Sequence, residues 1–228
     1  MNDLIQTVAV YALPVLFAIT LHEAAHAYAA RFFGDNTAYA MGRMTLDPFK
    51  HIDPVGTILI PIGLYLVTGG SFLFGYAKPV PINFGHLRRP KRDMAWVALA
   101  GPMANFVMAL IWTFGLYLLV RLDVDSRFLL LMMRAGILTN LVMMAFNLFP
   151  IPPLDGGRVL TSMLPNRLAY QFSRIEPYGF FIVMGLVIAK VLYSWWMFPL
   201  MFATTWVLAL LTPLPFGGLL NVVFRASF

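Results

Sequence analysis

The sequence predicts an all-α polytopic membrane protein with about five transmembrane helices, a re-entrant or buried hydrophobic element and a short extended β segment. Composition is the first reason, because 60% of the 228 residues are hydrophobic and only 11% are charged, which lies outside the range of soluble domains. The second reason is that apolar runs long enough to enter or cross a bilayer recur along the chain. They cover about residues 4–33, 54–68, 94–120, 128–149, 178–194 and 196–212.

These runs use nearly the whole length of the chain, so we expect one membrane-embedded domain over 1–228 with no attached soluble module. The net charge of +6 comes from basic residues scattered over short loops. This distribution predicts anionic lipid, and not nucleic acid, as the counter-charge. The chain has no cysteine, which excludes disulfides and leaves His, Asp and Glu as the available zinc ligands.

The first apolar run begins at Leu4 and leads into the motif His22-Glu23-Ala24-Ala25-His26. Two histidines four residues apart lie on one helical face, so both imidazoles can reach one Zn²⁺, and the adjacent glutamate can serve as a general base. Motifs of this kind also occur by chance. Here the motif lies among apolar neighbours, where His and Glu are costly unless they are paired or metal-bound, and this favours a zinc site.

A second acidic residue follows the apolar run 128–149. Three prolines, Pro150, Pro152 and Pro153, unwind the chain just before Asp155. Irregular backbone at membrane depth is tolerated only where it is buried in protein or lines a water-filled cavity. We therefore expect Asp155 to reach the same metal as His22 and His26. The alternative is an ordinary proline-rich exit turn in which Asp155 caps a helix.

A shared metal constrains the topology. His26 and Asp155 both lie at the C-terminal ends of their helices, so they can meet only if these two helices cross the membrane in the same direction. A full span at 54–68 would place the two residues at opposite leaflets. We therefore predict that 54–68 dips into the membrane and returns, or lies buried against the core, and that 94–120 is the one crossing between the two helices.

The basic residues support the same topology. In this arrangement twelve of the sixteen lysines and arginines fall on one side, which identifies that side as cytoplasmic. The N-terminus is then outside and the C-terminus inside. The short chain and the absence of a transit segment favour the plasma (inner) membrane of a prokaryote. Arg31 lies seven residues beyond the midpoint of the histidine motif, which places the metal about 10 Å below the cytoplasmic boundary at ~1.5 Å per residue.

Other polar residues carry weaker signals. His51 and Asp53 are two potential metal ligands on a loop, but capping at the start of the next apolar stretch explains them equally well. His86, beside Arg88 and Arg89, is interpreted as polar lining at the membrane interface. The runs at 178–194 and 196–212 contain no motif, and they could form a gate, an oligomer contact or a wall.

Four motifs together resemble the site-2 protease family of intramembrane zinc metalloproteases, in a short form without a PDZ or nucleotide-sensing CBS module. They lie in the order 22–26, 74–83, 101–105 and 147–156. In that family two His and one Asp bind zinc and the Glu is the catalytic base. The resemblance therefore implies one Zn²⁺ per chain held by His22, His26 and Asp155, with Glu23 as the base. The catalytic core would cover about 4–157 and the C-terminal helices about 178–224.

The resemblance implies a hydrolase that cleaves peptide bonds within or near transmembrane segments of membrane-anchored substrates, in regulated intramembrane proteolysis. Such a substrate helix must first be unwound. The extended segment around Pro79, Val80 and Pro81, near the active site, could hold the unwound chain by β-addition. Asn105 and Asn147 could donate to the oxyanion or fix the substrate strand. A surface loop and helix-to-helix hydrogen bonds are the respective alternatives.

Two other functions compete with proteolysis. A catalytically silent membrane protein of the same fold could bind or recruit other membrane proteins, although the intact Glu23 argues against it. A zinc transporter would need ionisable residues spaced along a path, whereas acidic residues are nearly absent from the spans outside the proposed site. The sequence leaves open the physiological substrate, the oligomeric state and any adaptor.

Overall fold

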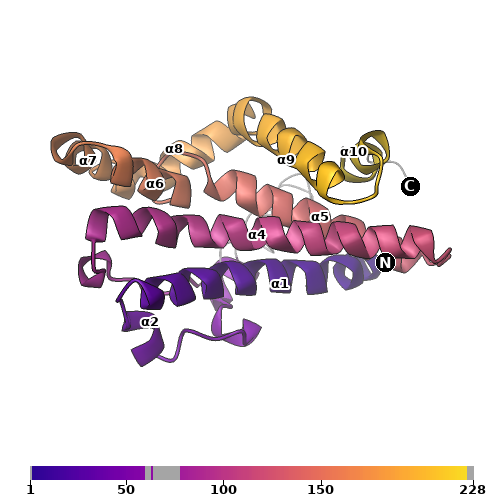
Figure 1. The fold of residues 1–228 in the computed structure, drawn as a ribbon, viewed down its shortest axis with the longest axis horizontal. Coiled ribbons are helices and arrows are strands. Elements are labelled where there is room, and N and C mark those ends of the chain that lie inside the picture. Colours follow the sequence, from indigo (N-terminus) through magenta and orange to yellow (C-terminus); the bar gives the residue numbers. More distant parts are fainter. Residues whose placement is uncertain (1, 60–62, 64–77, 225–228) are drawn as a thin grey trace.

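Three long helices form the centre of the protein. The computed structural model describes residues 2–59, 63 and 78–224 (Figure 1). Helix α1 covers Asn2–Phe32, α4 covers Pro90–Arg121 and α5 covers Arg127–Asn147. The three lie side by side along the longest axis, with α4 antiparallel to the other two. The C-terminal ends of α1 and α5 therefore lie at the same end of the molecule.

Shorter helices surround this centre. The helices that follow α5 in the sequence pack over α4 and α5, on the side away from α1 (Figure 1). These helices are α6 (Asp155–Met163), α7 (Asn166–Ser173), α8 (Glu176–Ile188), the turn η4 (Tyr193–Met197), α9 (Phe198–Leu211) and α10 (Phe216–Phe224). Between α1 and α4 the described elements are α2 (Thr37–Ala40), η1 (Pro48–Lys50), η2 (Pro54–Leu59) and η3 (Phe84–His86).

Local signals set the starts of the two later central helices. Helix α4 begins at Pro90, a favoured first helical residue, and the Asp93 carboxylate accepts a hydrogen bond from the Arg89 N–H at 2.7 Å, as in a capping box. Helix α5 begins after Ser126, whose hydroxyl oxygen accepts from the Leu129 N–H at 3.4 Å. These caps satisfy N–H groups that have no partner within the helix.

The apolar core lies between α4, α5 and the C-terminal helices. Ile137 and Leu141 of α5 and Leu208 of α9 have no exposed surface. Gly136 allows α5 to approach Trp112 of α4 closely, because a methyl group at position 136 would overlap the indole ring. The C-terminal helices therefore share one core with the central helices.

The fold class expected from the sequence is confirmed. Within the described residues, four helical segments are long and apolar enough to cross a membrane: Ile5–Phe32, Pro90–Arg121, Arg127–Asn147 and Tyr193–Leu211. Large apolar side chains on their outer faces are exposed, among them Phe17 of α1, Ile111 of α4 and Trp206 of α9. Such apolar outer faces are suited to lipid. The protein is an all-α polytopic membrane protein.

The number of crossings stays a prediction. The apolar run expected over 178–194 forms the 13-residue helix α8, which at ~1.5 Å per residue is about 20 Å long and shorter than the ~30 Å hydrocarbon core. A break follows it, where Lys190 adopts a positive φ of 59°. The chain then continues as the span Tyr193–Leu211.

The predicted re-entrant element falls only partly within the described residues. Pro54–Leu59 forms a helical turn, whereas 60–62 and 64–77 lie outside them. The Lys78 N–H donates to the His51 carbonyl oxygen at 3.0 Å, so the two ends of the intervening stretch lie next to each other. The expected short β segment is not confirmed, because residues 78–83, the part of it that the structure describes, form no strand.

Candidate metal centre

The His22, His26 and Asp155 side chains converge at one point. His22 and His26 lie one helical turn apart on the face of α1 that packs against α4, and their Nε2 atoms are 3.1 Å apart. Each Nε2 lies 3.3 Å from Oδ2 of Asp155. These residues form the one group of potential metal ligands within the described residues. The C-terminal part of α1 and the loop that follows α5 therefore meet at a common site, as the shared-metal argument requires.

Gly101 of α4 makes room for the two imidazoles. A methyl group at this position would overlap His26 Nε2 and would lie 2.6 Å from His22 Cε1. Real Cβ atoms essentially never approach other heavy atoms this closely. The glycine of the 101–105 motif, for which the sequence suggested no specific role, therefore allows α4 to pack directly on both rings.

The hydrogen bonds of the two rings indicate which nitrogen of each carries the hydrogen. His26 Nδ1 lies 2.7 Å from the carbonyl oxygen of Val97, which can only accept, so Nδ1 is the donor. His22 Nδ1 lies 2.6 Å from Oδ1 of Asn105. The Asn105 Nδ2 atom donates to the Ala18 carbonyl oxygen at 3.2 Å, which orients Oδ1 toward His22. Both Nε2 atoms therefore direct lone pairs at the point of convergence.

The resulting donor set fits zinc. Three acceptor atoms stand 3.1 to 3.3 Å apart, and Oδ2 of Asp155 is buried without a hydrogen-bond partner. Lone pairs this close together repel one another unless a cation or a shared proton lies between them. In a tetrahedral zinc site with bonds of about 2.0–2.1 Å, neighbouring ligand atoms are about 3.3–3.4 Å apart. The triangle therefore has the dimensions of one face of a zinc tetrahedron.

Asp155 is positioned by the loop that follows α5, whose backbone packs closely against Gly156 and Gly157. Helix α5 ends at Asn147, and Asp155 is the first residue of α6. Methyl groups at Gly156 or Gly157 would overlap the backbone of Leu148 or Pro152, respectively. Leu154, and not Asp155, is the N-cap of α6. The geometry therefore favours the metal interpretation of Asp155 over the helix-cap alternative.

Glu23 lies between the two histidines in sequence and contacts the proline-rich segment. The Val80 N–H donates to Glu23 Oε2 at 2.8 Å. Pro79 and Pro81 have no N–H, so Val80 supplies the single donor within this tripeptide. The Asn83 N–H further along is also engaged, by Asp35 Oδ2 at 2.7 Å. The segment expected to pair with substrate is thus anchored beside Glu23, and its pairing with a substrate stays a prediction.

Asn105 and Asn147 occupy different positions. Asn105 has no exposed surface, and its amide bonds His22 and the α1 backbone, which matches the helix-to-helix alternative. Asn147 is half-buried, and its Nδ2 donates to the Met143 carbonyl oxygen at 3.0 Å. The oxyanion role expected for these two amides stays a prediction. Of the two, Asn105 lies next to the metal ligands.

His51 and Asp53 do not form a second metal group within the described residues. His51 is buried, and its Nε2 donates to the Thr45 carbonyl oxygen at 3.0 Å. The Asp53 carboxylate accepts from the Val55 and Gly56 N–H groups at 3.0 and 2.7 Å. These contacts match the capping alternative.

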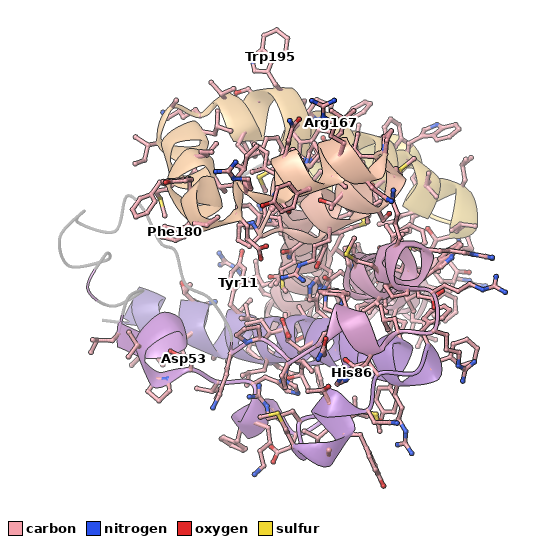
Figure 2. The ribbon with its side chains drawn as sticks, turned by 90° about the vertical axis from the view of Figure 1, so that its left-hand side faces the viewer. Tyr11, Asp53, His86, Arg167, Phe180 and Trp195 are labelled. Carbon is pink, nitrogen blue, oxygen red and sulfur yellow. The ribbon has the colours of Figure 1, made fainter. Side chains whose placement is uncertain are left out.

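Sequence reasoning missed Asp35. Its side chain is buried and accepts hydrogen bonds from Thr37 and from the Asn83 N–H, while the exposed His86 imidazole lies 3.5 Å away. Figure 2 shows His86 at the end of the molecule where α1 ends. Burial favours a raised pKa for Asp35, but the hydrogen bonds from Thr37 and Asn83 outweigh it and hold this pKa below its usual value. A lone Asp after Gly34 offered no sequence signal for this role.

Comparison with known proteins gives several related chains. The chain is 38% identical over 182 residues to "Putative zinc metalloprotease YwhC" of Bacillus subtilis, covering 76% of this chain and 78% of that protein. It is 31% identical over 182 residues to "Putative zinc metalloprotease Rip2" of Mycolicibacterium smegmatis, covering 79% and 67%. It is 26% identical over 159 residues to "Zinc metalloprotease MJ0392" of Methanocaldococcus jannaschii, covering 68% and 34%. No family model matches. No solved structure matches.

Proposed function

Because the chain belongs to the zinc metalloprotease family of YwhC and Rip2, we propose that it is an intramembrane zinc endopeptidase of the site-2 protease type. Membership identifies a hydrolase of peptide bonds that uses Zn²⁺. The observation that carries the proposal is the position of the ligand triangle. His22 and His26 lie within a helix long enough to cross a membrane, and Asp155 reaches them from the short loop that follows a second such helix. Peptide hydrolysis would therefore take place at membrane depth.

In this proposal His22, His26 and Asp155 hold the metal. Three protein ligands leave one coordination position free, as is usual in catalytic zinc sites. When bound there, zinc supplies Lewis-acid activation of water and of the scissile carbonyl. Asn105 and the Val97 carbonyl accept from the Nδ1 atoms and so keep both imidazoles oriented, which is how partners of metal-bound histidines usually act.

Glu23 acts as the general base. Its neighbours in sequence fix its position on α1, and the Val80 N–H holds one carboxylate oxygen at 2.8 Å. Glu23 would take a proton from the attacking water and later return it to the leaving amine. The extended segment from Pro79 to Pro81 would hold the unwound substrate beside this carboxylate.

The same arrangement supports the proposed domain and its proposed orientation in the membrane. The shared core supports a single domain over 1–228, with a catalytic core at about 4–157 and the C-terminal helices as its outer layer. The metal site lies near the end of α1 that carries Arg31, where the basic residues Arg88, Arg89 and Lys91 also gather at the start of α4. We assign this end to the cytoplasmic side of a prokaryotic plasma membrane. Transmembrane proteins or peptides would be the substrates.

The first test is zinc stoichiometry by elemental analysis of detergent-purified wild type, His22→Ala and Asp155→Ala. We expect about one zinc per wild-type chain and a loss in both variants, since two-ligand sites bind zinc far more weakly. Zinc that persists undiminished in folded Asp155→Ala would reject the ligand set. The second test reconstitutes the protein in liposomes with single-span peptides and maps the cleavage sites by mass spectrometry. Cuts confined to the soluble flanks would contradict cleavage within or near the membrane, and a folded, zinc-bound protein that cuts no peptide would favour the non-catalytic alternative.

A further inference from the structure

Asn140 lies in the middle of α5, outside every motif, and its amide continues the hydrogen-bond chain that begins at His22. Its Nδ2 donates to the Gly136 carbonyl oxygen at 2.8 Å, and its Oδ1 accepts from Asn105 Nδ2 at 2.9 Å. Neither asparagine has any exposed surface. A buried amide in an apolar helix is costly unless it is satisfied, and Asn140 meets this condition by pairing with the residue that contacts His22.

Backbone carbonyls determine the orientation of both amides in this series of hydrogen bonds. Because the Gly136 oxygen can only accept, Asn140 must direct its Nδ2 toward it and its Oδ1 toward Asn105. Asn105 must then direct its Nδ2 toward Asn140 and Ala18, and its Oδ1 toward His22. The bond to Asn140, at 2.9 Å, is shorter than the bond to Ala18, at 3.2 Å. Asn140 is therefore the closer of the two acceptors that prevent the Asn105 amide from exchanging its oxygen and nitrogen positions.

Reversal of the Asn105 amide would change the state of His22. The Asn105 NH₂ group would then face His22 Nδ1, which would have to accept, and the ring hydrogen would move to Nε2. A ring with its hydrogen on Nε2 has no lone pair for a metal at that atom. The orientation of Asn105 thus selects the His22 tautomer that can act as a ligand.

We propose that Asn140 is a positioning residue for the metal site, which acts through Asn105 to keep His22 in its metal-binding tautomer and orientation. The inference rests on the proposed function, because it takes His22 as a zinc ligand. It adds a role that neither the motifs nor the comparisons assign to Asn140. Partners of this kind typically change metal affinity by about 10–100-fold when they are removed.

The direct test measures zinc affinity of the detergent-purified full chain by competition with a chelating dye, for wild type, Asn140→Leu, Asn140→Asp and Thr113→Val. We expect Asn140→Leu to bind zinc about 10–100-fold more weakly. Asn140→Asp should bind within a few-fold of wild type, since a protonated carboxyl group can accept from Asn105 and donate to Gly136. Thr113 of α4 is the matched control, because like Asn140 it is fully buried and bonds a carbonyl oxygen one turn back on its own helix, but it lies two turns along α4 from Asn105.

A double substitution tests whether Asn140 acts through Asn105. Asn140→Leu should cause no further loss of zinc affinity in a chain that already carries Asn105→Leu, because the shared path is already broken. Additive losses would overturn the proposal. So would wild-type affinity in Asn140→Leu, or an equal loss in Asn140→Leu and Thr113→Val, which would indicate only a weakened contact between α4 and α5.

A spectroscopic measurement separates positioning from simple destabilisation. ¹⁵N NMR of histidine-labelled, zinc-free protein should show His22 with its hydrogen on Nδ1 in wild type and a mixture of tautomers in Asn140→Leu. With four histidines in the chain, the His22→Ala spectrum assigns the signal. An unchanged His22 tautomer in Asn140→Leu would reject the inference. If wild type binds no zinc at all, the proposed function fails instead, whereas zinc lost in His22→Ala but kept in Asn140→Leu rejects only the role of Asn140.

Discussion

Gly101 of α4 lies so close to His26 of α1 that any side chain at position 101 would overlap the imidazole. The two residues belong to antiparallel helices and are far apart in sequence. Their contact brings α4 against the face of α1 that carries both histidines. Asn105, one turn further along α4, then reaches His22. The glycine thus sets the packing on which the ligand geometry depends.

Gly101→Ala should therefore lower zinc affinity, by about tenfold or more, because the added methyl must displace at least one ligand ring from the triangle. Isothermal titration of the metal-free protein with zinc measures the effect. Gly115→Ala is the matched control on the same helix, since its methyl would meet only the flexible end of Met133. Equal zinc affinities in the two variants would contradict the steric role of Gly101.

Gly179→Ala should weaken the connection between α8 and the metal site. A methyl group at Gly179 would overlap the carbonyl group of Pro152, in the loop that delivers Asp155. Overpacking of this kind typically costs about 1–3 kcal/mol. We expect lower thermal stability and weaker zinc binding in the same variant, measured by a thermal shift with and without zinc.

Gly185→Ala on the same helix is the control for Gly179→Ala, since no atom lies within 4 Å of the added methyl. It should be neutral, or stabilising by up to about 1 kcal/mol through helix propensity. If both alanine variants behave alike, α8 has no specific role in holding the Asp155 loop.

Glu23→Gln should keep zinc and lose catalysis. The amide oxygen can still accept from the Val80 N–H, so the side chain can stay in place, but it cannot take a proton from water. General bases contribute about 10²–10⁴-fold to rate, and we expect a loss of this size in turnover with unchanged zinc content. Wild-type cleavage by pure Glu23→Gln protein would reject the assigned role.

Asp35→Asn should destabilise the protein at neutral pH, by about 1–3 kcal/mol, because an amide nitrogen would replace one of the oxygens that accept from Thr37 or Asn83. The pKa of Asp35 is lowered from 3.8 in the folded protein, so its ionised form stabilises the fold above pH ~4, and this contribution is lost as the pH falls through the folded pKa. The stability difference between wild type and Asp35→Asn should therefore shrink below pH ~4.

Thermal unfolding of both proteins over this pH range checks the Asp35 prediction. Asp125→Asn, at an exposed position, serves as the control and should leave stability nearly unchanged at every pH. A difference between wild type and Asp35→Asn that does not vary with pH would indicate that ionisation of Asp35 makes no contribution.

Much of the site could be predicted from local pattern. The apolar runs predict the long helices, because a segment in lipid must satisfy its own backbone hydrogen bonds. The four-residue spacing of His22 and His26 places both on one face by helical periodicity alone. Asp155 required one further step, the argument that both helices end on the same side of the membrane. The close approach of His22, His26 and Asp155 agrees with that argument.

The roles of other residues depended on contacts between helices. For Asn105 the sequence left open a role at the substrate or oxyanion and a helix-to-helix hydrogen bond, and the structure shows it bonded to His22 and Asn140 in the core. Val80 was expected to pair with substrate, and its N–H holds Glu23. An isolated asparagine or a free N–H in a sequence has many potential partners. The rotation of each helix and the course of each loop decide which partner it finds.

The sequence by itself determined the membrane fold class and the positions of the long helices, and it predicted a metal-ligand set of two histidines and one aspartate, because composition and spacing act locally along each segment. Only the tertiary structure decided that Gly101 admits the imidazoles, that Asn140 and Asn105 orient His22, and that Val80 holds Glu23. These contacts join segments distant in sequence. They depend on the register and rotation of packed helices, which local composition does not specify.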